Sequence, residues 1–184
     1  MIFYLLGPSH IGKTTLGLFA SKRIKNCEFF DLDKLVAQRN NIKHISDLPK
    51  KIGWDGFWRE CKAVLEELDE RYKNDDKVLC LVAIGAGALV SKEGQNYFKN
   101  CRNTITIYGF IEEAYIRNRL RTKRSYEEFK NSEYSKERMD VYKSSKFKFD
   151  ISGLNKEQAG EEFVKFLLNI LRNKRNIKNI DMNQ

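Results

Sequence analysis

The sequence has little proline and no long apolar run. Its 184 residues include only 2 prolines and 11 glycines, which excludes collagen-like chains and Pro-rich linkers. The longest apolar runs, residues 1–6 and 78–84, are far shorter than the roughly 20 residues that a membrane-spanning helix needs. No basic segment precedes the first run. We therefore expect no signal peptide and no membrane partner.

Cysteine is also sparse, and its pattern is uninformative about metals. The four cysteines, at positions 27, 61, 80 and 101, are widely scattered, and no two form a C-x-x-C pair. Cys80 lies inside an apolar run, where a thiol behaves as a small hydrophobic group. This usage predicts a protein of the reducing cytoplasm. Hydrophobic residues make up 41% of the chain and aromatic residues 12%, enough for a folded core.

Acidic residues are outnumbered, 25 against 34 lysines and arginines, so the formal net charge is +9. Such an excess favours anionic partners: nucleic acid, phosphorylated cofactors or small acids. Part of it lies in residues 171–178, which carry four basic residues and no acidic one. We interpret residues 172–184 as a solvated basic tail in preference to a nucleic-acid patch.

Short apolar runs alternate with segments of helical periodicity. We expect strands at residues 2–6, 27–31, 78–84, 104–108 and 147–151. We expect helices at residues 13–25, 57–72, 112–120 and 157–171. Strands that alternate with helices predict an α/β fold of three layers, in which a five-stranded parallel sheet carries helices on both faces.

One segment breaks this alternation. Residues 117–142 are crowded with charge and show little apolar periodicity. We expect an exposed, mobile lid here, at about residues 117–136. The remainder of residues 1–171 is predicted to form one domain around it.

Residues 7–14, Gly-Pro-Ser-His-Ile-Gly-Lys-Thr, satisfy the pattern G-x-x-x-x-G-K-[ST] between a predicted strand and a predicted helix. In such a loop the backbone N–H groups and the helix N-terminus point at a phosphate, the lysine bridges the β- and γ-phosphates, and the hydroxyl binds Mg²⁺. The alternative is a fortuitous glycine turn, and His10 is more readily a variable loop position than a catalytic group. The predicted ATP-binding residues are Gly7, His10, Ile11, Gly12, Lys13, Thr14 and Thr15.

Two carboxylates follow at the carboxyl end of the second predicted strand. Asp31 and Asp33 lie two residues apart, where an open parallel sheet binds its ligands. One could hold Mg²⁺ and the other could accept the proton of an attacking hydroxyl. The alternative is that one of them caps the helix expected to begin near Lys34.

At this point the chain resembles the shikimate kinases, a family of P-loop enzymes related to the nucleoside-monophosphate kinases. The resemblance runs in order over nearly the whole length. After the loop come the F-x-D-x-D element at 29–33, a segment similar to E-x-x-F-R at 55–59, the strand and glycine turn at 82–89, a lid arginine, the E-R-x-x-x-Y element at 137–142, and the strand and turn at 149–157.

The resemblance implies ATP-dependent phosphorylation of shikimate, a cyclic trihydroxy carboxylate, with Mg²⁺ as cofactor. It places Arg59 and Arg138 at the substrate carboxylate, since bidentate arginines suit it. It places Asp33 and the backbone of Gly85 and Gly87 at the hydroxyls. Its other implied roles are Mg²⁺ binding by Thr14 and Asp31, neutralisation of the transferring phosphoryl group by Lys13 and Arg124, and stacking of Arg119 on adenine.

The chain departs from the family pattern in the acceptor region. Ala86 replaces the middle glycine of the turn, Lys62 replaces a glutamate, Trp58 a phenylalanine, and Ser125 the proline after the lid arginine. Two alternatives therefore stay open: a related kinase for another polyol, sugar acid or nucleotide, or a non-catalytic nucleotide-binding protein. We expect a monomer with a small-molecule substrate and no nucleic-acid partner.

Overall fold

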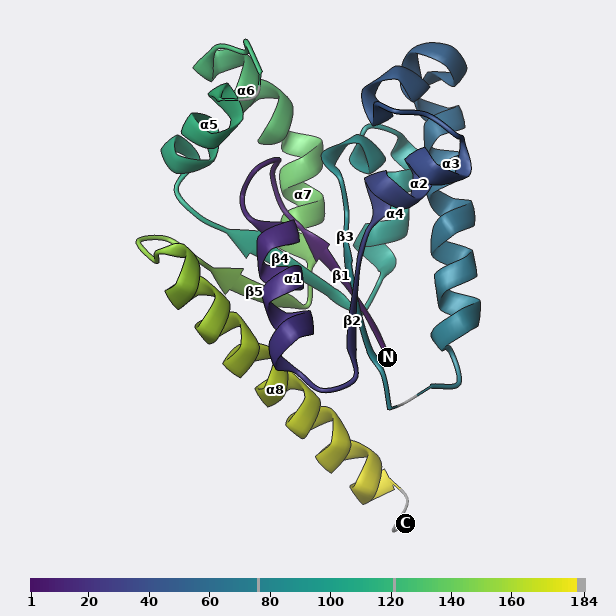
Figure 1. The fold of residues 1–184 in the computed structure, drawn as a ribbon, viewed down its shortest axis with the longest axis vertical. Coiled ribbons are helices and arrows are strands. Elements are labelled where there is room, and N and C mark those ends of the chain that lie inside the picture. The colour runs from purple at the N-terminus through teal and green to yellow at the C-terminus, as the bar shows by residue number, and fades with distance from the viewer. Residues whose placement is uncertain (76, 121, 182–184) are drawn as a thin grey trace.

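A five-stranded parallel sheet forms the centre of the protein (Figure 1). The computed structural model describes residues 1–75, 77–120 and 122–181. The strands lie in the order β2-β3-β1-β4-β5, and each neighbouring pair is parallel. They are β1 (Ile2–Leu6), β2 (Cys27–Asp31), β3 (Leu79–Ala83), β4 (Thr104–Tyr108) and β5 (Phe147–Asp150). The predicted α/β class and the five predicted strands are confirmed.

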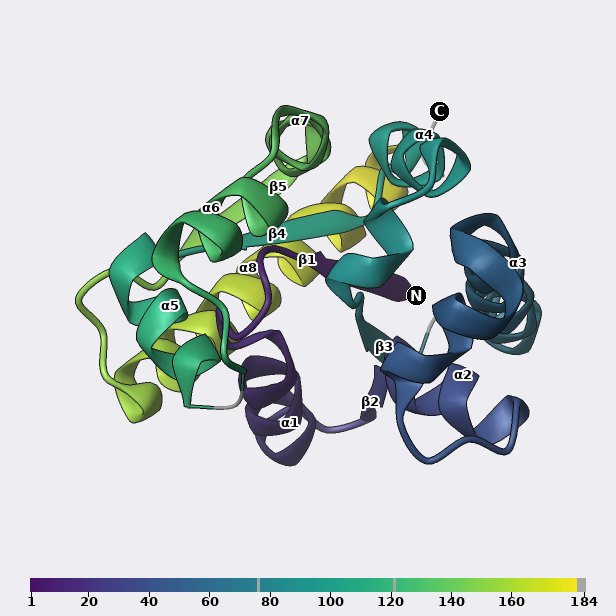
Figure 2. The ribbon, with the colours of Figure 1, turned by 90° about the horizontal axis from the view of Figure 1, so that it is seen from above.

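Helices cover both faces of this sheet (Figure 2). One face packs against α1 (Lys13–Arg23) and α8 (Lys156–Asp181); the other packs against α3 (Leu48–Tyr72), α4 (Lys92–Asn100) and α7 (Lys136–Ser144). In the central strand β1, Phe3 and Leu5 belong to the first core, and Tyr4 and Leu6 to the second. Successive side chains of a strand alternate between faces, so an apolar strand is buried on both. β1 therefore ends firmly anchored where the loop 7–14 begins.

The second core layer contains helical segments that the apolar periodicity did not predict in full. α2 (Leu32–Arg39) follows β2 directly, two residues before its expected start, and the 3₁₀ turn η1 (Ile45–Asp47) leads into α3. The expected helix 57–72 is the second part of α3. Its first part, from Leu48, is set off by Gly53, whose φ of 71° is not helical. A second 3₁₀ turn, η2 (Ala86–Leu89), follows β3.

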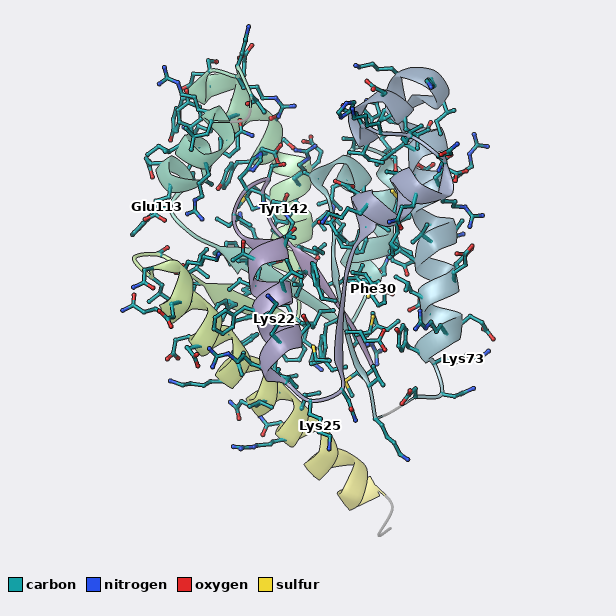
Figure 3. The ribbon with its side chains drawn as sticks, viewed as in Figure 1. Lys22, Lys25, Phe30, Lys73, Glu113 and Tyr142 are labelled. Carbon is teal, nitrogen blue, oxygen red and sulfur yellow. The ribbon has the colours of Figure 1, made fainter. Side chains whose placement is uncertain are left out.

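The charged segment after β4 folds into α5 (Ile111–Arg119), α6 (Tyr126–Glu133) and α7. α5 and α6 stand above the carboxyl ends of the strands, opposite α2 and the start of α3 (Figure 1). The expectation that residues 117–142 are exposed is wrong in part, because Phe129, Val141 and Tyr142 are at most 1% exposed. Tyr142, labelled in Figure 3, lies on α7 and belongs to the core, and its carbonyl oxygen accepts hydrogen bonds from Thr106 and Tyr108 of β4. Residue 121 of the expected lid lies outside the described residues.

The C-terminal helix is longer than predicted. α8 continues through Asp181, ten residues beyond the expected end at 171, so the segment 172–181, predicted as a solvated basic tail, is helical. Neither glycine nor proline follows Leu171 in the chain, so no residue there forces the helix to stop. Residues 182–184 of the expected tail lie outside the described residues. Within the described ranges, no helix combines the length and the apolar composition needed to cross a bilayer.

Candidate active site

The loop of residues 7–14 joins β1 to α1 at the carboxyl end of the sheet's central strand. Gly7 has a φ of 137° and Gly12 a φ of 117°, values that residues other than glycine rarely adopt. At Gly7 a Cβ atom would also lie 2.6 Å from the carbonyl oxygen of Ile107. Gly12 is the N-cap of α1 and supplies no side-chain cap, and no acidic residue lies in the first turn. No side-chain cap or first-turn carboxylate of α1 therefore competes with an anion for its first amides.

A cleft of about 650 Å³ opens above this loop, between the carboxyl end of β3 and α5. His10 and Thr15 line it, whereas Ile11 is 1% exposed and packs in the core beneath the loop. Ile11 thus anchors the loop and does not face the cleft. The remaining lining residues come from the loop, β2, α2, β3 and α5: Ser9, Gly12, Lys13, Thr14, Asp31, Asp33, Lys34, Ala83, Ile84, Gly85, Ala86, Arg117 and Leu120.

Lys13 is the buried cation of the site. Its side chain folds over the loop, and Nζ donates hydrogen bonds to the carbonyl oxygens of Gly7 at 2.7 Å and Pro8 at 2.8 Å. Burial lowers the pKa of Lys13 to about 8, and the carboxylates of Glu133, Asp33 and Asp31 oppose this shift in that order. A phosphate bound to the loop would favour the charged ammonium further.

The Thr14 hydroxyl donates a hydrogen bond to Asp31 Oδ2 at 3.0 Å. Asp31 occupies the N-cap position of α2, but its side chain makes no capping hydrogen bond. The alternative that Asp31 serves only as a helix cap therefore lacks its expected contact. A hydroxyl oxygen and a carboxylate oxygen at this distance are suitable ligands for Mg²⁺, which takes its other ligands from water and phosphate. In the described part of the chain, no group of three or more His, Cys, Asp or Glu residues forms an all-protein metal cage.

Asp33 lies in the first turn of α2, where its carboxyl group faces the cleft. Among the described residues, its buried Oδ1 has no hydrogen-bond partner. Desolvation, and then the negative charge of Asp31, raise the pKa of Asp33 to about 6, and Lys13 opposes the shift. The carboxyl group also lies directly against the backbone of Gly85, so close that a Cβ atom there would overlap all three of its atoms. Gly85 is thus the residue that lets the turn after β3 approach Asp33.

Two of the predicted arginines meet at one buried carboxylate. Arg138 Nη1 lies 3.4 Å from Glu133 Oε2, and Arg124 Nη1 lies 3.4 Å from Glu133 Oε1. Glu133 Oε2 also accepts the backbone N–H of Ser9 in the phosphate-binding loop at 3.0 Å. Neither arginine is among the residues that line the cleft, but Ser9 is. Both guanidinium groups are therefore tied to the edge of the cleft through Glu133.

Three other predicted residues lie away from the cleft. Arg59 is exposed on α3, and within the described residues its side chain has no ion pair or hydrogen bond. Its neighbour Trp58 is the one that turns inward, against Gly94 and Phe98. Arg119 is exposed at the end of α5. Gly87 does not line the cleft, and a Cβ atom at this position would meet Phe57.

Sequence reasoning missed three charged residues of the site, Lys34, Arg117 and Glu133. Arg117, one half-turn before Arg119, is the arginine of α5 that lines the cleft. Its Nη2 atom lies 2.9 Å from Oε2 of Glu113, which is labelled in Figure 3. The spacing of α5 would reveal which arginine faces inward only with the helix boundaries known. Glu133 carries no motif of its own. Its burial at 3% exposure emerges only from the packing of α6 against the loop.

One family recurs in the comparisons with known proteins. A family model described as "Shikimate kinase" matches residues 10–168. The shikimate kinase of Legionella pneumophila (strain Corby) is 28% identical over 123 residues, which are 66% of this chain and 65% of that protein. The match thus spans just under two thirds of the length of this curated relative.

Solved structures extend the likeness over the fold. The structure of shikimate kinase from Acinetobacter baumannii in complex with shikimate has a TM-score of 0.69 at 24% identity, and the match covers 94% of each chain. Shikimate kinase from Aquifex aeolicus has a TM-score of 0.64 at 27% identity, over 95% of this chain and 98% of that one. The parallel sheet and its helical layers are therefore those of a P-loop kinase.

Proposed function

Because this chain belongs to the shikimate kinase family, we propose that it transfers the γ-phosphoryl group of ATP to the 3-hydroxyl of shikimate. The products are ADP and shikimate 3-phosphate. The observation that carries the proposal is the convergence of Lys13, the Thr14–Asp31 pair and Asp33 on one cleft. A protein that only bound nucleotide would have no use for Asp33, a second carboxylate with a raised pKa beside the phosphate loop.

The loop amides and the N-terminus of α1 bind the phosphates of ATP, and Lys13 leaves the carbonyls of Gly7 and Pro8 to bridge the β- and γ-phosphates. Thr14 and Asp31 are the residues that would hold Mg²⁺, since their oxygen atoms fit its preference. The metal, when bound, neutralises charge on the phosphates. Arg117 lines the nucleotide side of the cleft, and we assign it the contact with the base that the sequence assigned to Arg119.

Asp33 accepts the proton of the acceptor hydroxyl. As that O–H bond breaks, the acceptor oxygen forms its bond to the γ-phosphorus, and ADP departs with the electrons of the bond that it loses. With a pKa of about 6, the carboxyl group is largely ionised at neutral pH and is a stronger base than an ordinary aspartate. Gly85 keeps the turn after β3 close enough to hold the hydroxyl against Asp33. Arg138 supplies the charge for the acid group of the acceptor.

A second candidate acceptor, another polyol or hydroxy acid, is favoured by two observations. Neither of the two arginines expected at the shikimate carboxylate lines the cleft, since Arg59 is exposed on α3 and Arg138 is paired with Glu133 at the edge of the cleft. Ala86 lines the cleft where the family pattern has glycine. Both differences alter the acceptor side and leave the nucleotide side unchanged.

Product analysis separates these acceptors. The protein is incubated with Mg·ATP and, in parallel, with shikimate, other sugar acids, polyols and nucleotides, and the phosphorylated product is identified by ³¹P NMR. Shikimate 3-phosphate as the main product supports the proposal. A phosphate ester of another acceptor, with none of shikimate, would assign the second candidate.

We place this reaction in the cytoplasm and assign it to a monomer acting on small molecules, without a nucleic-acid or membrane partner. The cysteines support the compartment, since all four are free thiols: Cys61 and Cys80 are buried, and Cys27 and Cys101 are half-buried. An oxidising compartment would favour paired cysteines.

A further inference from the structure

Glu133 is a buried charge that the reaction as described does not use. It is the last residue of α6 and is only 3% exposed. Removing a carboxylate from water is costly unless cationic groups and hydrogen-bond donors replace the solvent. A glutamate at this depth therefore depends on its partners.

Its partners come from three separate parts of the chain. The N–H of Ser9 in the loop 7–14 donates to Oε2 at 3.0 Å, Arg138 on α7 lies 3.4 Å from the same oxygen, and Arg124 lies 3.4 Å from Oε1. Ser132 completes the clamp: its carbonyl oxygen accepts from Arg138 Nη1 at 2.5 Å, and its hydroxyl lies 3.4 Å from Arg124 Nη1. The dipeptide 132–133 thus contacts both guanidinium groups and the phosphate loop.

The net charge of this cluster favours an anionic ligand. Two guanidinium groups face one carboxylate, so the cluster keeps one net positive charge next to the loop. Arg138 has only 11% of its side chain exposed, whereas Arg124 has 49% exposed. Arg138 therefore depends more strongly on Glu133 for compensation, because little water reaches it.

We propose that Glu133 is a positioning residue that fixes Arg138 and Arg124 against the phosphate-binding loop through its contacts with both guanidinium groups and Ser9. The inference rests on the proposed function, in which these arginines meet the acceptor's acid group and the transferring phosphoryl group. Preset guanidinium groups need not be ordered when substrates bind, which conserves binding energy for the transition state. Without Glu133, Arg138 would lose its charged partner and its direction.

The test replaces the charge and keeps the shape. In Glu133→Gln an amide oxygen can still accept from Ser9, but the negative charge is lost. We expect KM for shikimate to rise at least tenfold and kcat to fall, while the dissociation constant for a non-hydrolysable ATP analogue, measured by calorimetry, changes less than threefold. The matched control is Glu127→Gln, which removes one exposed carboxylate from the same helix. It should leave both constants unchanged.

A double-mutant cycle with Arg138→Met tests whether Glu133 acts through that arginine. If it does, Glu133→Gln adds less than a twofold change once Arg138 is absent. An equal loss in both backgrounds, or wild-type constants for Glu133→Gln, would overturn the proposal.

A readout independent of activity separates this inference from the proposed function. The ¹⁵N signal of the Arg138 Nε–H group, identified by its absence in Arg138→Lys, should shift or broaden in Glu133→Gln and stay in place in Glu127→Gln. An unmoved signal in Glu133→Gln would refute the positioning role, even if wild-type protein phosphorylates shikimate. A wild-type protein that leaves shikimate untouched but shows the expected shift would refute only the proposed acceptor.

Discussion

Replacing Gly85 with alanine tests the contact on which the acceptor chemistry depends. A Cβ atom at this position would overlap both carboxylate oxygens and Cγ of Asp33, far inside the 3.0 Å that real Cβ contacts respect. Either the carboxyl group or the turn after β3 must move by about 1 Å, and a misplacement of this size can cost on the order of 10²-fold in rate. We therefore expect kcat to fall about 100-fold.

The neighbouring glycine provides the matched control. At Gly87 a Cβ atom would meet Phe57 Cε1 at 3.1 Å, which a small movement of a side chain relieves. We expect Gly87→Ala to lower kcat less than about fivefold, because no catalytic group moves. Steady-state kinetics with shikimate as the varied substrate, together with calorimetric affinity for an ATP analogue, compares the two variants. If Gly85→Ala keeps wild-type kcat, or loses nucleotide affinity to the same extent as turnover, Asp33 is not positioned by this turn.

Two further predictions concern charged side chains. Arg138→Ala should weaken binding of the acid substrate by about 2 to 5 kcal/mol, the scale for unpairing a buried charge. Arg59→Ala should change KM for shikimate less than threefold, because Arg59 is exposed. Comparable effects of the two substitutions would contradict the assignment of Arg138, and not Arg59, to the acid group of the substrate. For Asp33, a pKa of about 6 predicts that kcat/KM falls with acid below pH 6. The folded state binds the proton of Asp33 more tightly than the unfolded state does, so the protein loses stability as pH rises from about 4 to 6 and this carboxyl group ionises. Asp33→Asn should therefore raise Tm more at pH 7.5 than at pH 4. An equal rise in Tm at both pH values would contradict the raised pKa.

Much of the fold was predictable because its strands are short, and β1 and β3 are buried along their whole length. The run 2–6 is apolar and the run 104–108 is rich in β-branched residues, and each is followed by glycine, so composition and turn residues identify both strands. The lid region was not predictable in this way. α6 is an eight-residue helix with one fully buried apolar residue, Phe129. A single buried residue gives no repeat of apolar positions from which a helix could be predicted. Its capping box at Ser125 and Glu128 was the readable signal.

The candidate site likewise contains residues that the sequence could place and residues that it could not. Residues held by the loop and by strand ends, such as Lys13, Asp31 and Asp33, lie where the sequence predicts, because a local motif sets their geometry. Arg59 and Arg119 do not line the cleft. The sequence could not predict this, because the direction of each side chain depends on how α3 and α5 are rotated about their axes. A shift of one or two residues on a helix turns a side chain by 100° or more.

The central claim is that this cleft phosphorylates shikimate with ATP, and a coupled assay of ADP release tests it most directly. The assay uses Mg·ATP with and without shikimate, on wild-type protein and on Lys13→Ala. The account predicts ADP release that depends on shikimate in the wild type and disappears in the variant, which lacks the cation that bridges the phosphates. ADP release that is indifferent to shikimate, or that survives the loss of Lys13, would contradict it.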